Sequence, residues 1–193
     1  MCIRDRYIDI FDLLELEDYY RTDLHWRQEM LAPTAKALAD AMGVSLTVDF
    51  TEVTLDTPFY GVYRGQSALP MEPDRLAYLT NSVIEGCRVY DYENSEYLPV
   101  YTLEKADGSD PYEIFLSGPK SLLRIENPNA QAERKLLVFR DSFAASLLPL
   151  LAEGYSEITL ADIRYLSPSM LGKFIDFTAQ DVLFLYSTSV LND

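Results

Sequence analysis

The chain has 193 residues, a formal net charge of −15 at neutral pH, and 48% hydrophobic residues. A chain of this length and composition is most simply one globular domain that can bury a core without metals or disulfides. The negative charge repels a phosphate backbone, and no local cluster of lysine and arginine offsets it, so we expect no nucleic-acid partner.

The cysteines give no support for a metal site. Cys2 and Cys87 do not form a closely spaced ligand pair, and the chain has a single histidine, so zinc would lack ligands. The two thiols can be free or paired, and their spacing does not decide between these states. We expect no metal and no cofactor. No apolar run reaches the roughly 18 residues of a membrane span, and the N-terminus lacks the layout of a signal peptide.

The first predicted elements are helices. Apolar residues at helical spacing predict a helix over residues 7–18 and another over 27–42. Pro33 shifts the start of the second helix to near residue 32 or kinks it, and Gly43 provides its C-terminal stop. Residues 1–6 look like foreign sequence at the end of an assembled fragment, so we expect the true N-terminus and any export signal to lie upstream.

The middle of the chain has the pattern of strands. Alternating, β-branched and aromatic residues predict strands between 44 and 63, followed by a loop over 64–75. Two further alternating runs predict strands over 88–92 and 96–101. We interpret residues 44–112 as a β-rich, tyrosine-rich insertion within one domain. Its tyrosines could form a platform that stacks against sugars, or they could be ordinary residues of strand surfaces.

The C-terminal part of the chain alternates between strands and helices. This order predicts a parallel α/β sheet. The expected strands cover 122–125, 136–139, 157–162 and 182–186, and the expected helices cover 143–151, with a bend at Pro149, and 170–177.

Ser142 is the first candidate functional residue. It follows a continuous apolar run at 136–139, which is typical of a strand covered on both faces, and it precedes a helix. Ligands of open parallel sheets bind beyond the carboxyl ends of the strands, and N–H groups at a helix start can stabilise an oxyanion. The position resembles a nucleophile elbow, although the glycines of that motif are absent. Ser142 or Asp141 could instead simply cap the helix.

His25 is the only candidate base. A serine nucleophile needs a base, and the base needs a group that orients it, for which Asp23 is the nearest carboxylate. Residues two apart do not share a helical face, so the pair requires an extended or turning backbone. The alternative interpretation is that His25 is a structural histidine and Trp26 a core residue.

Several segments together resemble a known family. The segments 20–26, 136–143, 158–165 and 181–186, with the turn at Gly118, resemble the DHHW protein family. That family is similar to the SGNH-hydrolase-like domains of the alginate O-acetyltransferases.

The resemblance implies a fold and a set of site residues. The fold would be an α/β, SGNH-hydrolase-like three-layer α/β/α sandwich with a mainly parallel sheet, formed as a single domain by residues 7–193. Ser142 would be the nucleophile, His25 the base and Asp23 its orienting group, with Gly118 in an oxyanion or substrate loop. The chain departs from the family pattern at Leu24, where the first of two histidines is expected. Weaker substrate contacts are expected from Tyr20, Arg21, Trp26 and Arg140.

The resemblance also implies a biological setting. Such proteins are extracytoplasmic bacterial proteins, often with an N-terminal membrane anchor, and their relatives act on acetylated envelope polysaccharides beside a membrane acyltransferase. Our first hypothesis is a serine acetylesterase or O-acetyltransferase that works through an acetyl-serine intermediate. The second is an inactive module that binds carbohydrate or a partner. The sequence leaves the glycan and the oligomeric state open.

Overall fold

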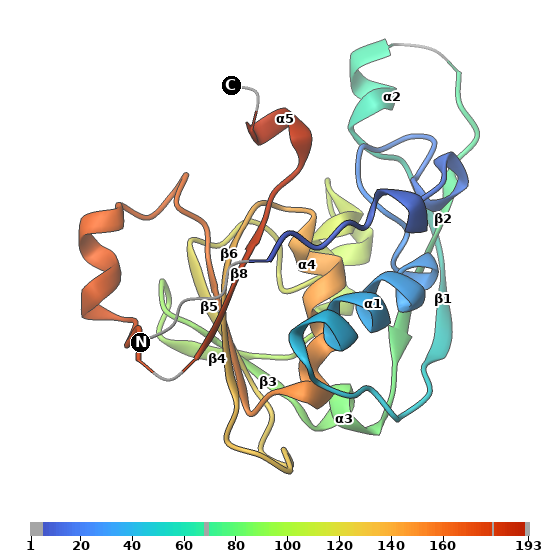
Figure 1. The fold of residues 1–193 in the computed structure, drawn as a ribbon. Helices are drawn as coiled ribbons and strands as arrows, with labels where there is room; N and C mark the ends of the chain where they lie inside the picture. The colour runs from blue at the N-terminus through green and yellow to red at the C-terminus, as the bar shows by residue number, and fades with distance from the viewer. Residues whose placement is uncertain (1–5, 68–69, 179, 192–193) are drawn as a thin grey trace.

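The computed structural model describes residues 6–67, 70–178 and 180–191 (Figure 1). Most of the segment interpreted as foreign, residues 1–6, lies outside this part of the chain. The described residues form a mixed α/β fold with one six-stranded sheet and one two-stranded sheet. Within the described residues, every helix is too short or too polar to cross a bilayer.

The six-stranded sheet has the order β4-β3-β5-β7-β6-β8. Its strands are β3 (Arg88–Asp91), β4 (Glu96–Leu98), β5 (Leu122–Glu126), β6 (Lys135–Arg140), β7 (Glu157–Ala161) and β8 (Asp181–Leu185). β6 pairs in parallel with β7 and with β8, whereas the β3–β4, β3–β5 and β5–β7 pairs are antiparallel.

The prediction of a mainly parallel sheet is therefore wrong, because the sheet is mixed. The connection between β5 and β6 covers only residues 127–134. Two parallel strands need a crossover of about a dozen residues or more, so a connection this short returns the chain in the opposite direction. The three parallel strands are the C-terminal β6, β7 and β8, where strands and helices alternate in the sequence.

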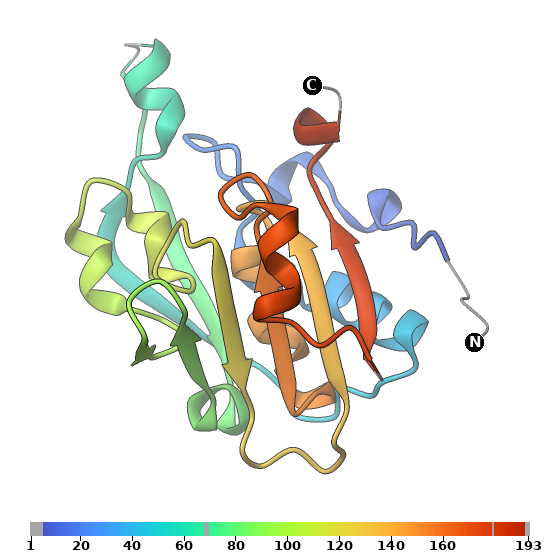
Figure 2. The ribbon, with the colours of Figure 1, turned by 90° about the vertical axis from the view of Figure 1, so that its left-hand side faces the viewer.

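Both faces of the six-stranded sheet are covered, as Figure 2 shows with η7 in front and α1 behind. On β6, Leu136 and Val138 belong to the larger core, and Leu137 and Phe139 belong to a second, smaller core on the opposite face. The continuous apolar run of β6 is explained by this two-sided burial. The larger core lies under α1 (Ala32–Met42), α4 (Ala144–Leu147) and η6 (Leu148–Gly154).

The segment predicted to be β-rich, residues 44–112, is divided between the two sheets. β1 (Thr51–Phe59) and β2 (Asp74–Thr80) form an antiparallel pair of their own, whereas β3 and β4 join the large sheet. The predicted loop over 64–75 is partly helical, because α2 (Val62–Ser67) follows β1. The short helices of this region are α3 (Ser82–Gly86), η4 (Leu103–Asp107) and η5 (Pro111–Ile114).

The predicted helix over 7–18 is absent. This segment contains only the 3-10 turns η1 (Phe11–Leu13) and η2 (Leu16–Asp18), and Leu16 is 83% exposed. Carboxylates bind nearby backbone N–H groups here: Asp9 accepts from Phe11, and Asp18 accepts from Glu15. Such local bonds compete with helix formation, so apolar spacing alone did not produce a helix.

The second predicted helix is present with a later start. η3 (Gln28–Met30) precedes α1, Pro33 lies in the first turn of α1, and Gly43 ends the helix with a φ of +71°. This is the shifted start that Pro33 allowed. The C-terminal helices are shorter than predicted. Residues 143–151 divide into α4 and the 3-10 helix η6, residues 170–177 contain only the end of η7 (Pro168–Lys173), and α5 (Thr188–Leu191) is a single turn.

Candidate active site

Ser142 lies in the turn between β6 and α4. Its carbonyl accepts a hydrogen bond from the N–H of Ala145 at 3.1 Å, which starts the helical turn. The neighbouring Asp141 is buried, and its carboxylate accepts from the N–H of Phe143 at 3.0 Å and from the N–H of Ser187 at 2.6 Å. Asp141 therefore satisfies the backbone of the turn, and Ser142 Oγ lies 2.8 Å from His25 Nε2.

Asp23 holds the other side of the same imidazole. Asp23 Oδ1 lies 2.6 Å from His25 Nδ1 and also accepts from the backbone N–H of His25 at 3.0 Å. With Nδ1 donating to the carboxylate, Nε2 is the acceptor that faces the Ser142 hydroxyl. The structure thus brings together the three residues that the sequence singled out, in a continuous hydrogen-bonded chain.

The loop that carries Asp23 and His25 has the turning backbone that their spacing requires. Tyr19 and Trp26 pair as an isolated antiparallel bridge, and the N–H of Tyr20 donates to the carbonyl of His25 at 3.1 Å. The chain therefore doubles back between these residues, and Asp23 and His25 point into the same space. A helix could not have produced this arrangement.

Asp74, at the start of β2, fixes the base of this loop. Its carboxylate accepts from the backbone N–H of Arg21 at 3.2 Å, and from both the N–H and the hydroxyl of Thr22 at 2.7 Å each. The Thr22 oxygen in turn accepts from the N–H of Gly61 at 3.0 Å. This carboxylate orients the loop, because its loss would leave the backbone N–H groups of Arg21 and Thr22 without their acceptor.

The segment after β1 closes over Asp23. The N–H of Val62 donates to Asp23 Oδ2 at 3.0 Å. At Gly61, an added Cβ would overlap the Asp23 side chain and come within 2.5 Å of the Thr22 carbonyl oxygen. Only glycine allows this close approach of two backbone segments.

The surroundings of Asp23 favour its charged form. Burial alone raises the pKa of the Asp23 carboxyl. The hydrogen bond and charge of His25 and the N–H groups of Val62 and His25 outweigh burial and hold the pKa below its usual value. Asp23 is therefore an anion at neutral pH and would stabilise a protonated His25.

Tyr112 and Phe143 pack against the His25 ring. The rings of Tyr112 and His25 are stacked, with centroids 3.9 Å apart and planes 11° apart, and Phe143 lies at 4.9 Å. The Tyr112 hydroxyl donates to Ser146 Oγ at 3.0 Å, and burial raises its pKa, so the hydroxyl stays protonated. These contacts limit rotation of the imidazole away from Ser142.

Two of the expected substrate contacts are core residues instead. Tyr20 is 3% exposed and packs edge-on against Phe59, and Trp26 is 7% exposed and packs edge-on against Phe143. The core interpretation of Trp26 is thus the one that the structure favours. Arg21 keeps an exposed guanidinium, which lies 3.4 Å from Asp74.

Arg140 and Gly118 are also placed by the fold. Arg140 is 1% exposed, and its guanidinium donates to the backbone carbonyls of Lys120 at 3.0 Å and Asp141 at 3.3 Å. These bonds indicate a structural role at the end of β6. Gly118 ends a tight turn with a φ of +84°, and its N–H donates to the carbonyl of Phe115 at 3.2 Å. An oxyanion role for Gly118 stays a prediction.

No group of three histidine, cysteine or acidic side chains in the described part of the chain could hold a metal ion. Cys87 is a buried free thiol, and burial raises its pKa to about 11. Cys2 lies outside the described residues, and so does any disulfide bond between Cys2 and Cys87.

Sequence reasoning missed the residues that support the site. Asp74, Gly61, Val62 and Tyr112 come from segments far from both Asp23 and Ser142 in the chain, and none has a local motif that marks it. A pairing of β1 with β2 would have been the useful signal, because it places the end of β1 and the start of β2 beside residues 21–23.

The comparisons with known proteins concern the fold. No family model matches the chain, and no curated protein matches it. Among solved structures, a DHHW family protein from Eubacterium siraeum superposes with a TM-score of 0.72 at 22% identity, covering 91% of this chain and 61% of that one. Bacillus cereus PatB1 with a sulfonyl adduct has a TM-score of 0.69 at 22% identity, covering 90% of this chain and 62% of PatB1.

A second structure of Bacillus cereus PatB1 gives the same TM-score of 0.69 at 21% identity, with 90% of this chain and 63% of PatB1 covered. The chain thus spans a little over three fifths of the length of these neighbours. The resemblance read from the sequence is confirmed at the level of the fold: the chain shares its fold with a DHHW family protein and with PatB1.

Proposed function

We propose that the chain is an SGNH-like serine acetylesterase or O-acetyltransferase that acts through an acetyl-Ser142 intermediate. The observation that carries this proposal is the hydrogen-bonded chain from Asp23 through His25 to Ser142, at 2.6 Å and 2.8 Å. These separations are within the reach that a nucleophile and its base require, whereas the alternative, an inactive binding module, predicts no such contact.

In the first half of the reaction, Ser142 Oγ attacks the carbonyl carbon of an acetyl ester while His25 Nε2 takes the hydroxyl proton. The imidazolium that forms lies against the Asp23 carboxylate, which is charged at neutral pH. The tetrahedral intermediate then expels the alcohol oxygen, which receives the proton from His25. The products are a free hydroxyl compound and acetyl-Ser142.

In the second half, the oxygen of water or of a sugar hydroxyl attacks the carbonyl carbon of acetyl-Ser142 while His25 takes its proton. The bond from that carbon to Ser142 Oγ then breaks, Oγ receives the proton from His25, and acetate or an acetylated sugar leaves. The two acceptors distinguish an esterase from a transferase, and both use the same residues. Gly118 is proposed as the oxyanion or substrate-loop residue, which requires its N–H to share or release the bond to Phe115.

The proposed setting follows from the resemblance to the DHHW family. We assign the substrate to acetylated polysaccharide of the bacterial cell envelope, and the site of action to the extracytoplasmic side of a membrane to which the full-length protein is anchored. A membrane acyltransferase is the proposed protein partner, as the source or recipient of the acetyl group.

Hydrolysis of 4-nitrophenyl acetate tests the proposal. We expect turnover by the wild-type chain, none above background for Ser142→Ala, and a loss on the order of 10²- to 10⁴-fold for His25→Ala. Ser45→Ala is the matched control, because Ser45 is exposed and lies outside the site. Equal rates for the wild type and Ser142→Ala would reject the serine mechanism and favour the binding module.

A further inference from the structure

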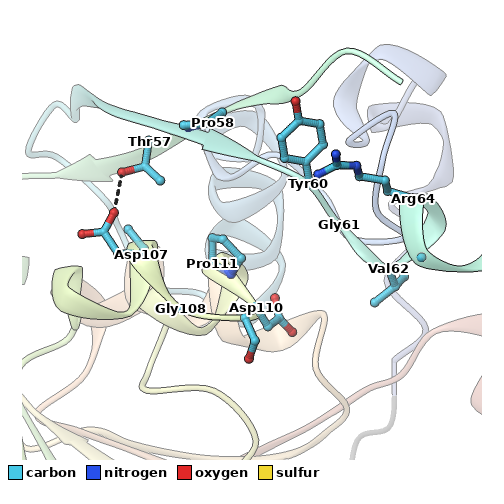
Figure 3. Close-up of a pocket in the computed structure, with 13 residues that line it drawn as sticks. Thr57, Pro58, Tyr60, Gly61, Val62, Arg64, Asp107, Gly108, Asp110 and Pro111 are labelled. Carbon is cyan, nitrogen blue, oxygen red and sulfur yellow. Dashed lines mark hydrogen bonds between the residues drawn. The ribbon is translucent and has the colours of Figure 1, made fainter. Parts of the chain in front are cut away.

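A cavity of about 580 Å³ lies beside the candidate active site, between the end of β1 with α2 and the loop that joins η4 to η5 (Figure 3). Part of its wall is the backbone of Gly61 and Val62. The N–H groups of these two residues are the ones that donate to Thr22 Oγ1 and Asp23 Oδ2. One short segment therefore belongs both to the cavity and to the support of Asp23.

The opposite wall of the cavity is equally close to the site. Asp110 and Pro111 line it, and the next residue in the chain is Tyr112, whose ring is stacked on His25. Burial raises the pKa of Asp110, the N–H of Tyr112 opposes that rise, and the negative charge of Asp23 adds to it. The cavity thus lies next to the Asp23–His25 pair.

The polar groups of the cavity include both donors and acceptors. The Arg64 guanidinium lies 3.7 Å above the ring of Tyr60 and makes no ion pair with any described residue. Asp110 Oδ1 accepts from the N–H of Tyr112 at 3.1 Å, which leaves its second oxygen for a ligand. Thr57 donates to Asp107 at 3.1 Å, as Figure 3 shows. A ligand with many hydroxyl groups suits this wall, because each hydroxyl both donates and accepts.

The charge of the cavity argues against an anionic ligand. Asp107 and Asp110 outnumber Arg64 among its charged lining residues, and the whole chain carries −15. The two carboxylates and the net negative charge of the chain would both repel an anion. A neutral polyol can instead donate to the carboxylates and accept from the guanidinium.

We propose that this cavity binds a neutral sugar residue of a glycan chain, next to the residue that is presented to Ser142. The orientation toward Ser142 rests on the proposed function, whereas binding of the sugar does not. The cavity would then select the glycan, and the Asp23–His25–Ser142 chain would act on the acetyl group of a neighbouring residue.

Calorimetric titration of Ser142→Ala with β-1,4-linked tetrasaccharides of glucose and of N-acetylglucosamine tests the proposal without turnover. We expect at least one of them to bind, and Arg64→Ala and Asp110→Asn in the same background to weaken binding by at least about tenfold, as expected for hydrogen bonds to charged groups. Lys36→Ala and Asp40→Asn are the matched controls: they remove the same charges from an exposed ion pair on α1, which does not line the cavity.

Three outcomes would overturn the proposal: no binding of either neutral tetrasaccharide at millimolar concentration, equal binding by the cavity variants and the controls, or tighter binding of a hexuronate tetramer. Thermal unfolding of each variant separates lost contacts from lost folding. The proposed function is tested apart from this, by acetylation of wild-type Ser142. Sugar binding without acetylation would reject the serine mechanism alone, and acetylation without sugar binding would reject the cavity alone.

Discussion

Gly61 and Asp23 are in direct contact, and no side chain larger than hydrogen fits between them. A Cβ added to Gly61 would overlap the Asp23 side chain, and the next residue, Val62, donates its N–H to Asp23 Oδ2 at 3.0 Å. The segment between β1 and α2 therefore sets the position of the carboxylate that orients His25.

Gly61→Ala should lower esterase activity without abolishing folding. The added methyl group moves Asp23, and a displacement of about 1 Å in a catalytic group can cost about 10²-fold in rate. The measurement is kcat for 4-nitrophenyl acetate. Gly172→Ala is the control, because an added Cβ at Gly172 meets no atom within 4 Å. If Gly61→Ala retains the wild-type rate, the orienting role of Asp23 is wrong.

Substitutions of Asp141 and Ser142 should have different effects, the first mainly on stability and the second mainly on activity. Asp141→Ala removes the acceptor for the N–H groups of Phe143 and Ser187, so we expect the free energy of unfolding to fall by about 1–2 kcal/mol or more, as for a lost helix cap. Ser142→Ala should abolish activity and change the free energy of unfolding by less than about 1 kcal/mol.

Denaturant unfolding of the two variants, measured side by side, gives the comparison. The reverse pattern, with a stable Asp141→Ala and a destabilised Ser142→Ala, would assign the capping role to the serine and remove the main argument for it as a nucleophile.

The ion pair between the buried Asp91 and the partly buried Lys120 predicts how stability depends on pH. Lys120 Nζ lies 2.8 Å from Asp91 Oδ2. Burial alone raises the pKa of Asp91, but the bond and charge of Lys120 and the N–H of Glu93 outweigh it and lower the pKa. The pKa of Asp23 and that of Glu126 are lowered as well.

A carboxyl whose pKa is lower in the folded state binds more protons in the unfolded chain. Its contribution to stability is complete above the unfolded pKa of about 4 and is lost as the pH falls through the folded value. The free energy of unfolding should therefore decrease below about pH 4. Lys120→Met should lower the free energy of unfolding by about 1–3 kcal/mol at neutral pH. Asp91 would lose its countercharge and keep only the donors from the backbone of Glu93 and the side chain of Asn94. A flat profile from pH 6 to pH 3 would contradict this account.

The parts of the fold that the sequence predicted are those with strong local signals. β6 has a continuous apolar run, α1 has a proline near its start and a glycine at its end, and both elements are present. The segment 7–18 has helical spacing but also Asp9 and Asp18, whose side chains bind backbone N–H groups and hold the chain in turns. The mixed sheet was not predicted, because the pairing of β5 with β7 depends on contacts distant in sequence.

The candidate site also contains residues that the sequence identified and residues that it did not. Asp23, His25 and Ser142 could be identified because the chain has one histidine, one acidic residue two positions before it, and a serine at a strand end. The residues that hold them could not. Asp74, Gly61 and Tyr112 act through tertiary contacts. Arg140 is buried, although the family resemblance implied a weak substrate contact for it.

Mass analysis of the protein after incubation with 4-nitrophenyl acetate, followed by peptide mapping, shows whether Ser142 is the nucleophile. We expect one acetyl group per chain on wild-type protein, located on Ser142, absent from Ser142→Ala and strongly reduced in His25→Ala. An acetyl group that maps to another residue, or that forms equally on all three proteins, would contradict the proposed role of the Asp23–His25–Ser142 chain.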